Sequence, residues 1–345
     1  MLSEDTGPGR IPGAPDGWHT RTPERSDVGQ LADLVASHQA SVLGSASVDA
    51  EAVEVEAVGM GSWTRRQLVA VDAAGRIRAW ARVHDRAAGR TVVTVTVDPV
   101  CSEGGLAGWL FRWGELVALE VAAQRQLTFT QLDSGAYAVD ERQRRWLGDA
   151  GYDLARTWLQ MSRPVGPEEA DPGVLPPLRP GLAIRPVASH DNGLPVAADL
   201  QTVHQLLEES FADHFNSYRE SFPEFLQRLR EDPGHRWDHW WIATAEIDGT
   251  HQPAGAVVSS VLPADADGRH GSYIDYIGVH RRARGRGVAK ALLHTVIADA
   301  ARRGRSRVGL EVDADSPTGA DGLYVAMGWQ TRYRTESWHQ TVHTA

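Results

Sequence analysis

The sequence is poor in the features that would assign it to a secreted, metal-binding or membrane class. Cys101 is the single cysteine in 345 residues, so an intrachain disulfide is excluded and a cysteine-based metal site is disfavoured. No apolar run approaches the ~20 residues of a membrane span, and residues 1–17 contain no apolar signal core. We therefore expect a cytoplasmic protein with no metal and no membrane contact.

Positive charge is also scarce. The chain has 35 Lys and Arg against 45 Asp and Glu, a formal net charge of −10 at pH 7, which argues against nucleic acid as a partner. A hydrophobic content of 42% and a charged content of 23% are those of a globular protein, and the length suggests two domains. Residues 1–17, rich in Gly, Pro and acidic residues, are predicted to be a disordered leader.

What the sequence does contain is one order of elements that occurs twice. Residues 18–165 show the patterns of a strand, two helices, three strands, a helix, a strand, a helix and a strand. Residues 181–345 repeat that order. Residues 166–180 carry five prolines and cannot hold a helix or a central strand, so we interpret them as a linker.

Two landmarks indicate that the repeat is in register. Val97 and Val279 end the fourth strand of each half, and the Gly-aromatic pairs at Gly151 and Gly328 stop the last helix of each half. The offset between the two valines is nearly equal to the offset between the two glycines. Offsets this close favour an internal duplication. The alternative is a chance similarity of two α/β halves.

The stretch from Tyr273 to Trp329 predicts an anion site. A strand, a Gly/Arg turn, a helix and a second strand follow one another there. Gly285 and Gly287 let the backbone approach a ligand closely, and the first amides of the following helix have no intrahelical acceptors. Together with the positive end of the helix dipole, these amides suit a phosphate or pyrophosphate. The alternative is that the arginines of the turn form a solvated or nucleic-acid-facing patch.

Two motifs in this stretch resemble those of the GNAT superfamily of N-acetyltransferases. Val279-x4-Arg284-Gly285-Arg286-Gly287-Val288-Ala289 is similar to the family's acetyl-CoA motif, Q/R-x-x-G-x-G/A. Ser316-Pro317-Thr318-Gly319-x3-Leu323-Tyr324-x3-Gly328-Trp329 is similar to its second signature, N-x-x-A-x-x-L-Y-x-x-x-G-F. The duplicated layout resembles the tandem subgroup to which mycothiol synthase belongs. The resemblance covers residues 182–342 well and residues 18–165 in outline.

The resemblance implies an α/β (α+β) fold class with two tandem GNAT folds, each a mixed, mostly antiparallel sheet flanked by helices. It implies a degenerate GNAT-like domain at residues 18–165 and a catalytic domain at residues 181–345. In this family the fourth strand splays from the fifth. The cleft between them takes the pantetheine arm of acetyl-CoA, which is the implied co-substrate.

The matched motifs imply which residues contact acetyl-CoA. Main-chain groups of the fourth strand would meet the pantetheine and the thioester oxygen, and the Gly/Arg turn would wrap the pyrophosphate. Ser316 stands where the family usually has Asn. The implied contacts are Ile277, Gly278, Val279, Arg284, Gly285, Arg286, Gly287, Val288, Ala289, Ser316 and Tyr324.

Tyr324 stands where the family has a tyrosine whose hydroxyl lies near the sulfur of coenzyme A. A phenol with a pKa of about 10 can protonate a departing thiolate, so the implied role is general acid; the alternative is a core tyrosine. The family often uses a carboxylate on the fourth strand as the base. We assign that role to Asp275, and we expect Tyr273 on the same strand face as a nearby site residue. The alternative is that Asp275 pairs with a surface arginine or caps the edge of the sheet.

The acceptor is expected against the segment ESFADHFNSYRESF, where this fold usually builds a lid over the substrate. The alternative is that its aromatic residues belong to the core. The residues expected to line the acceptor are Phe211, His214, Phe215 and Tyr218.

The first half departs from both motifs. Its turn has lost every arginine and contains Glu103, and Leu147 stands where the second half has Tyr324. A carboxylate beside a pyrophosphate is an unfavourable pairing. We therefore expect catalysis from the second half alone.

The predicted activity is direct transfer of an acetyl group from acetyl-CoA to a primary amine of a small molecule or peptide. One alternative is acetylation of a cysteinyl amino-sugar conjugate, as in mycothiol synthase, although Tyr273 stands where that pattern would have Glu. Another is a non-catalytic acyl-CoA-binding or sensor protein. A monomer and a homodimer both stay open.

Overall fold

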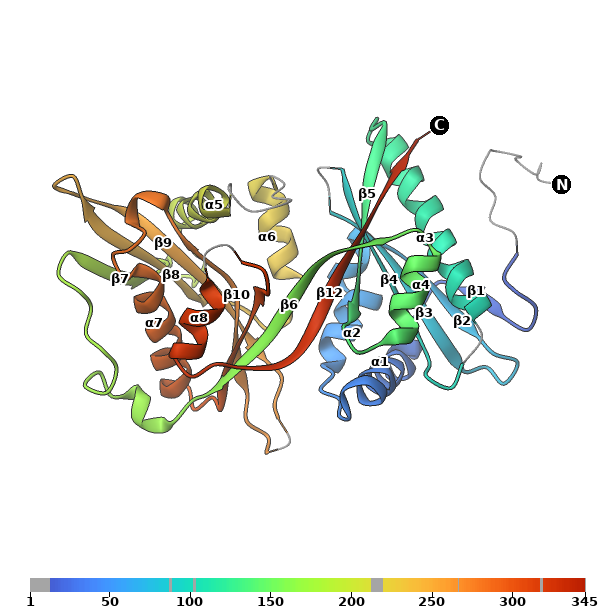
Figure 1. Cartoon of the computed structure of the whole chain (residues 1–345), viewed down its shortest axis with the longest axis horizontal. Coiled ribbons are helices and arrows are strands. Elements are labelled where there is room, and N and C mark those ends of the chain that lie inside the picture. The colour runs from blue at the N-terminus through green and yellow to red at the C-terminus, as the bar shows by residue number, and fades with distance from the viewer. Residues whose placement is uncertain are drawn as a thin grey trace. The chain divides into compact units, whose positions relative to one another are not determined.

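The structure, a computed structural model, describes residues 13–86, 89–101, 104–211, 220–265, 267–316 and 319–344. The chain forms two compact units (Figure 1). The first unit consists of Met1–Thr157 and Arg334–Ala345, and the second unit consists of Trp158–Tyr333.

The first unit contains a sheet with strand order β1-β2-β3-β4-β5-β12, in which only β4 and β5 run parallel. Its other strands are β1 (His19–Arg21), β2 (Arg65–Val71), β3 (Ile77–Asp85), β4 (Arg90–Val97) and β5 (Phe129–Tyr137). Its helices are α1 (Val28–Leu43), α2 (Ala50–Ala57), α3 (Gly104–Gln124) and α4 (Glu141–Asp149), with the 3-10 turns η1 (Arg25–Asp27) and η2 (Met60–Thr64).

The second unit repeats this plan with strand order β6-β11-β10-β9-β8-β7, in which only β10 and β11 run parallel. Its strands include β7 (Leu182–Pro186), β8 (His235–Ile247), β9 (Thr250–Leu262), β10 (Gly271–Val279) and β11 (Arg307–Asp313). Its helices are α5 (Ala197–Phe211), α6 (Phe222–Arg230), α7 (Val288–Arg302) and α8 (Ala320–Ala326), with the 3-10 turns η3 (Pro167–Ala170) and η4 (Arg281–Ala283). The fold class is therefore the expected one, with mixed, mostly antiparallel strands flanked by helices in each unit.

The closing strand of each half belongs to the other half's unit. Strand β6 (Asp153–Pro164) ends the first half, yet its Trp158–Pro164 segment pairs antiparallel with β11 in the second unit. Strand β12 (Gln330–His343) ends the chain, yet Thr335–His343 pair antiparallel with β5 in the first unit. The compact units thus differ from the expected division at residues 165 and 181. The cause is long-range strand pairing, which hydrophobic patterning does not reveal.

Both faces of each sheet are covered by helices. In the first unit Leu110 of α3 and Leu147 of α4 lie in one apolar cluster, and Leu31 of α1 lies in the cluster on the other face. In the second unit Leu292 of α7 packs with β10 on one face, and Val203 of α5 packs with β8 and β9 on the other. Strand alternation produces this division, because successive side chains point to opposite faces.

The proline-rich segment expected to be a linker belongs to the second unit, where it packs against α7. The turn η3 contacts α7. From Pro172 to Leu182 the segment lines a cavity of about 440 Å³ together with residues of α7 that include Lys290 and His294. Prolines that cannot join a helix or sheet ladder still fit against a helix face, because that packing needs no backbone donor.

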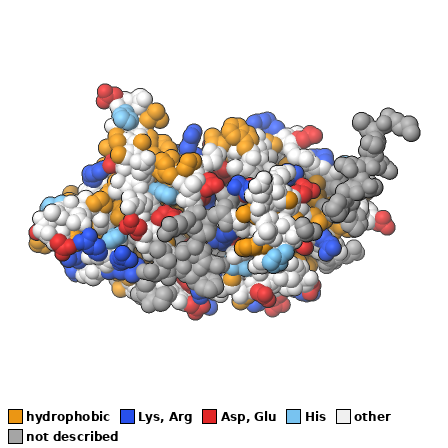
Figure 2. Space-filling model, turned by 90° about the horizontal axis from the view of Figure 1, so that it is seen from above, with side chains coloured by type: hydrophobic (Ala, Val, Ile, Leu, Met, Phe, Trp, Pro, Cys, Tyr) orange, Lys and Arg blue, Asp and Glu red, His pale blue; other side chains and the backbone are white. Residues whose placement is uncertain are grey.

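Charged side chains of both signs are interspersed on the face of the molecule that Figure 2 shows. No described helix is long and apolar enough to cross a membrane.

Candidate active site

Strands β10 and β11 separate partway along their length. They pair at Ser272↔Val308, Tyr273↔Gly309 and Ile274↔Leu310, and pairing stops there although β10 continues to Val279 and β11 to Asp313. The splay expected between the fourth and fifth strands is therefore present, and it begins directly before Asp275.

Strand β10 also contains one residue more than its first-unit counterpart β4. In the first unit, the β3–β4 pairing runs from Ala79↔Val97 to Val83↔Val93. In the second unit, the equivalent β9–β10 pairing runs from Gly255↔Val279 to Ser259↔Ile274. Between these two pairs the residue number changes by four in β3, β4 and β9, but by five in β10. The extra residue is Asp275, which has no partner on β9 and forms a β-bulge.

The bulge directs Asp275 to the face covered by α5 and α6. Its Oδ1 lies 3.3 Å from Ser260 Oγ, which donates to it, and Tyr276 belongs to the apolar cluster on that face. Burial, and then the negative charge of Asp232, raise the pKa of Asp275 to about 7, against the lowering effects of the Ser260 hydrogen bond and the charge of Arg228. A carboxylate with a pKa near neutrality can take a proton from an ammonium group and pass it on.

Tyr273 lies on the same face as Asp275, as expected. It pairs with Ser260 across β9 and β10, and its hydroxyl lies 3.5 Å from Gln160 Oε1. Burial, followed by the charges of Glu311 and Asp275, raises the pKa of Tyr273 far above its ordinary value. Tyr273 therefore keeps its proton at neutral pH and can act there only as a hydrogen-bond partner.

The open edge of β10 presents the main-chain groups of Ile277 and Val279. The carbonyl oxygen of Gly278 points toward Gly255 of β9, since a Cβ added to Gly255 would lie 2.7 Å from it. Main-chain groups of alternate residues face opposite edges of a strand, so those of Ile277 and Val279 face the splay. Gly278 itself lies against α5, where an added Cβ would come within 3.0 Å of Leu207 and Ser210.

The turn before α7 has the geometry of an anion cradle. Gly285 and Gly287 have φ angles of +77° and +86°, a conformation that glycine adopts without strain. Gly287 is the N-cap of α7 and supplies no side-chain cap. The amides of Val288 and Ala289 therefore begin the helix without intrahelical acceptors.

Two arginines of the turn contact other residues of the chain, and an arginine from outside the turn lies beside Gly287. Arg286 donates to the Glu246 carbonyl oxygen at 3.1 Å, and Arg282 pairs with Asp248. The side chain of Arg179, from the proline-rich segment, lies within 3.1–3.3 Å of where a Cβ of Gly287 would be. Sequence reasoning missed Arg179 because its segment carried only the signal of a linker.

Tyr324 lies on the opposite face of the sheet from Asp275. It is buried in the apolar cluster that includes α7, and its ring contacts Trp329 edge-on at 5.9 Å. Burial raises its pKa to about 12, so the phenol is protonated at neutral pH. Its hydroxyl forms no hydrogen bond within the described part of the chain. Ser316 lies in the loop before α8, where its carbonyl oxygen accepts from the Gly319 amide at 3.1 Å.

Of the expected acceptor residues, only Phe211 can be placed. It ends α5 and contacts Tyr276 edge-on at 6.4 Å, next to the Asp275 bulge. This places it in an aromatic cluster on the same face as Asp275. The expected residues His214, Phe215 and Tyr218 lie outside the described residues.

The corresponding edge in the first unit is occupied by the chain's own side chains. Arg142 donates to the carbonyl oxygen of Val97 at 3.0 Å, and Gln143 donates to that of Val95 at 3.2 Å. Val95 and Val97 correspond to Ile277 and Val279 of the second unit. When Gly151 is aligned with Gly328, Arg142 and Gln143 fall on Gly319 and Ala320, which have no such donors.

Within the described residues, no group of three or more His, Cys, Asp and Glu side chains could hold a metal ion.

Residues 200–329 match the acetyltransferase (GNAT) family. The comparison with curated proteins found no match.

Several solved structures share the architecture of the whole chain. A GCN5-related N-acetyltransferase from Sphaerobacter thermophilus is 24% identical with a TM-score of 0.75, covering 96% of this chain and 98% of its own. A tandem GNAT protein from the clavulanic acid biosynthesis pathway is 16% identical with a TM-score of 0.65, and the match covers 95% of this chain and 99% of that protein. The N-myristoyltransferase of Saccharomyces cerevisiae, solved with myristoyl-CoA, is 9% identical with a TM-score of 0.60, covering 97% and 81%. At these identities the likeness shows the fold.

Proposed function

Because residues 200–329 are an acetyltransferase domain of the GNAT family within a tandem GNAT fold, we propose that the second unit transfers an acetyl group from acetyl-CoA to a primary amine. Acyl transfer is the general class of reaction that this domain family supports. The acceptor is a small-molecule or peptide amine, and transfer to it is direct.

Acetyl-CoA would lie in the splay between β10 and β11. The amides at the start of α7 and the Arg179 guanidinium would hold its pyrophosphate. The open main-chain groups of Ile277 and Val279 would hold the pantetheine arm and polarise the thioester carbonyl, as preorganised amides do for a developing oxyanion.

Two residues on opposite faces of the splay would handle the protons. Asp275 takes the ammonium proton on the α5–α6 face, and the neutral amine attacks the thioester carbon. The nitrogen then loses its second proton to solvent, and collapse of the tetrahedral centre breaks the C–S bond. The Tyr324 phenol protonates the departing thiolate and regains its own proton from solvent. The protonation states favour these roles, because a carboxylate with a pKa near 7 is half ionised at neutral pH, whereas a phenol with a pKa near 12 stays protonated.

The observation that carries the proposal is the open edge of β10 beside an uncapped helix N-terminus. Replacing Gly287 by Glu tests it, since a side chain there meets Arg179 and brings a carboxylate to the cradle. We expect titration calorimetry to show acetyl-CoA affinity at least 100-fold weaker in Gly287→Glu.

The matched control is Gly304→Ala at the other end of α7. Gly304 also has a positive φ, of +67°, and has open space around it. This variant carries the same backbone strain away from the cradle, so its affinity should equal that of the wild type. Equal affinity in Gly287→Glu would overturn the assignment of the site.

A non-catalytic acyl-CoA sensor is the second candidate. A panel of primary amines separates the two, because transfer releases free coenzyme A thiol and sensing does not. Release with at least one amine, abolished in Asp275→Asn, supports transfer. Binding without release across small-molecule and peptide amines supports the sensor.

A further inference from the structure

A cavity of about 620 Å³ lies between α3 and α4 of the first unit, and the proposed reaction makes no use of it. Its floor is aromatic, formed by the buried rings of Phe111 and Trp146. Its other lining residues are Pro99, Gly108, Arg112, Glu115, Arg142, Arg145, Asp149 and Ala150.

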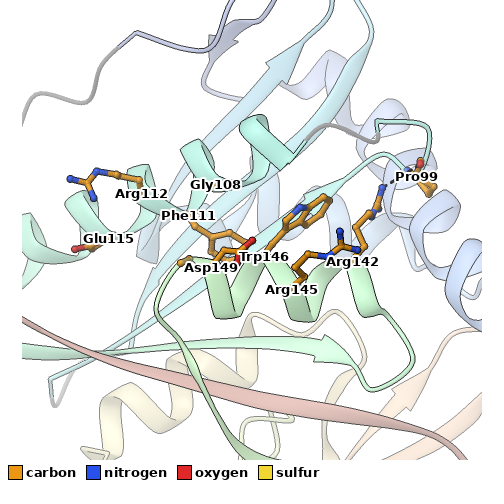
Figure 3. Close-up of a pocket in the computed structure, with 10 residues that line it drawn as sticks. Pro99, Gly108, Phe111, Arg112, Glu115, Arg142, Arg145, Trp146 and Asp149 are labelled. Carbon is orange, nitrogen blue, oxygen red and sulfur yellow. Dashed lines mark hydrogen bonds between the residues drawn. The ribbon is translucent and has the colours of Figure 1, made fainter.

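The charges around the cavity are unevenly placed. In Figure 3 Arg142 and Arg145 lie toward the Pro99 end, whereas Asp149 lies beside Phe111, and Glu115 and Arg112 extend from α3 at the far end. Arg142 lies 4.7 Å from the centroid of the Trp146 ring. Arg145 is exposed and forms no ion pair within the described part of the chain. The Pro99 end of the cavity is therefore cationic, and the Arg145 guanidinium at that end has no carboxylate partner within the described residues.

The cavity corresponds to the space between α7 and α8 in the second unit, but its strand side is closed. Arg142 and Gln143 already bond the carbonyl oxygens of Val97 and Val95. An extended arm therefore has no main-chain partners along β4. Only a ligand short enough to stay between the two helices fits this space.

We propose that this cavity binds a small carboxylate or phosphate that also carries hydroxyl or amino donors. The anionic group meets Arg145, since guanidinium pairs well with both anions. Arg142 adds its positive charge at the same end, while its terminal nitrogens donate to the carbonyl oxygens of Val97, Asp98, Pro99 and Cys101. The donor groups meet Asp149. The site needs nothing from the acyl-CoA assignment, because every residue that forms it lies in the first unit.

Titration calorimetry of the full chain with citrate, a hydroxy-carboxylate, and with inorganic phosphate tests the proposal at low ionic strength. We expect saturable binding of at least one probe, weakened at least tenfold in Arg145→Ala and weakened as salt is raised. Arg144→Ala is the matched control. It removes the same charge from the same helix, but its side chain pairs with Glu336, so binding should change less than twofold.

Phosphate can also bind at the start of α7, so the titration is repeated in Gly287→Glu. Binding that survives there and is lost with the added Arg145→Ala belongs to the first unit, whether or not the second unit binds acetyl-CoA. Exposed Arg112→Ala, on the opposing helix at the far end of the cavity, is a second control, and its binding should also change less than twofold. The proposal is overturned if the Gly287→Glu chain shows no saturable binding, or if Arg145→Ala binds as the wild type does.

Discussion

The two units share one plan but differ at the edge of their central strands. In the second unit, β10 ends beside a splay where the main-chain groups of Ile277 and Val279 have no strand partner on β11 among the described residues. A left-handed glycine at Gly287 and a buried carboxylate at Asp275 lie in the same unit. In the first unit, Arg142 and Gln143 bond the equivalent carbonyl oxygens. One scaffold thus supports an open edge and a closed one, so the chemistry depends on a few side chains and not on the fold.

The bulge is the smallest of these differences and has the largest consequence. Without it, β4 keeps Val93, Val95 and Val97 pointing to the α3 face, where all three are buried. The extra residue in β10 directs Asp275 to the opposite face while Ile274 before it and Ile277 after it pack toward α7. A single inserted residue therefore places a carboxylate on the α5–α6 face without disturbing the core.

Asp275→Asn should produce the largest effect, because it removes the proposed base. We expect kcat to fall about 10²–10⁴-fold with acetyl-CoA affinity unchanged, measured by coenzyme A release and calorimetry. Wild-type activity should rise with pH through about 7, the pKa of Asp275. Asp248→Asn, an exposed carboxylate at the β8–β9 turn, is the control and should retain full activity.

The same substitution should also change the pH dependence of stability. Folding raises the pKa of Asp275, so the wild type loses stability as the pH rises from about 4 toward 7. Asn does not titrate. Tm of Asp275→Asn should exceed that of the wild type at pH 8, with the difference shrinking toward pH 4, and a difference independent of pH would contradict a buried ionising carboxylate.

Tyr324→Phe and Leu147→Ala compare equivalent positions of the two units. Tyr324→Phe should lower kcat roughly 10- to 100-fold, which is at or below the usual rate contribution of one general acid. Tm should stay nearly unchanged. Leu147 is fully buried, so Leu147→Ala should cost about 2–5 kcal/mol of unfolding free energy with normal turnover of the folded enzyme. Equal kcat for Tyr324→Phe and wild type would remove its role as acid.

Gly278→Thr installs the side chain that the first unit carries at the equivalent strand position, Thr96. An added Cβ would lie 3.0 Å from Leu207 and Ser210 of α5, so we expect a loss of about 1–3 kcal/mol by overpacking. Urea unfolding measures it, with Thr96→Val as the control in the first unit. A neutral Gly278→Thr would show that α5 can withdraw from β10.

Ser260→Ala should have the smallest effect. The Ser260 hydroxyl donates to Asp275 and lowers its pKa, so its removal should move the midpoint of the pH–rate profile upward by less than about one unit. Ser259→Ala is the control, because Ser259 is buried on the opposite face of the sheet and its hydroxyl does not donate to Asp275. This variant should leave the midpoint unchanged. A downward shift would mean that the hydroxyl does not stabilise the carboxylate.

Much of the fold was predictable because it depends on local patterns. Helical spacing, alternation in strands and the Gly-aromatic pairs predicted the two sheets, their helices and the register of the repeat. In that register the Tyr152 amide donates to the carbonyl oxygen of Leu147, and the Trp329 amide donates to that of Tyr324, each at 3.0 Å. The exchange of β6 and β12 was not predictable, since strand pairing across more than a hundred residues leaves no periodic signal.

The candidate site could be outlined in part for the same reason. Motif spacing pointed to Gly285, Gly287 and Tyr324 as candidates, and alternation predicted that Tyr273 and Asp275 share one face of the strand. Sequence patterns do not reveal a bulge, whose effect appears only in the register with β9, nor the packing of Arg179 against Gly287 across more than a hundred residues. The hydrogen bonds of Arg142 and Gln143 to β4 in the first unit could also be seen only in three dimensions. The sequence showed only that the turn of the first half lacks the arginines of the second.

Amide hydrogen exchange with and without acetyl-CoA tests the contrast between the two edges most directly, because both are observed in one chain. The open-edge account predicts slower exchange for amides in residues 277–279 and 287–290, and no change in residues 95–97 or at the start of α3. Protection in residues 95–97, or none in residues 277–290, would contradict it.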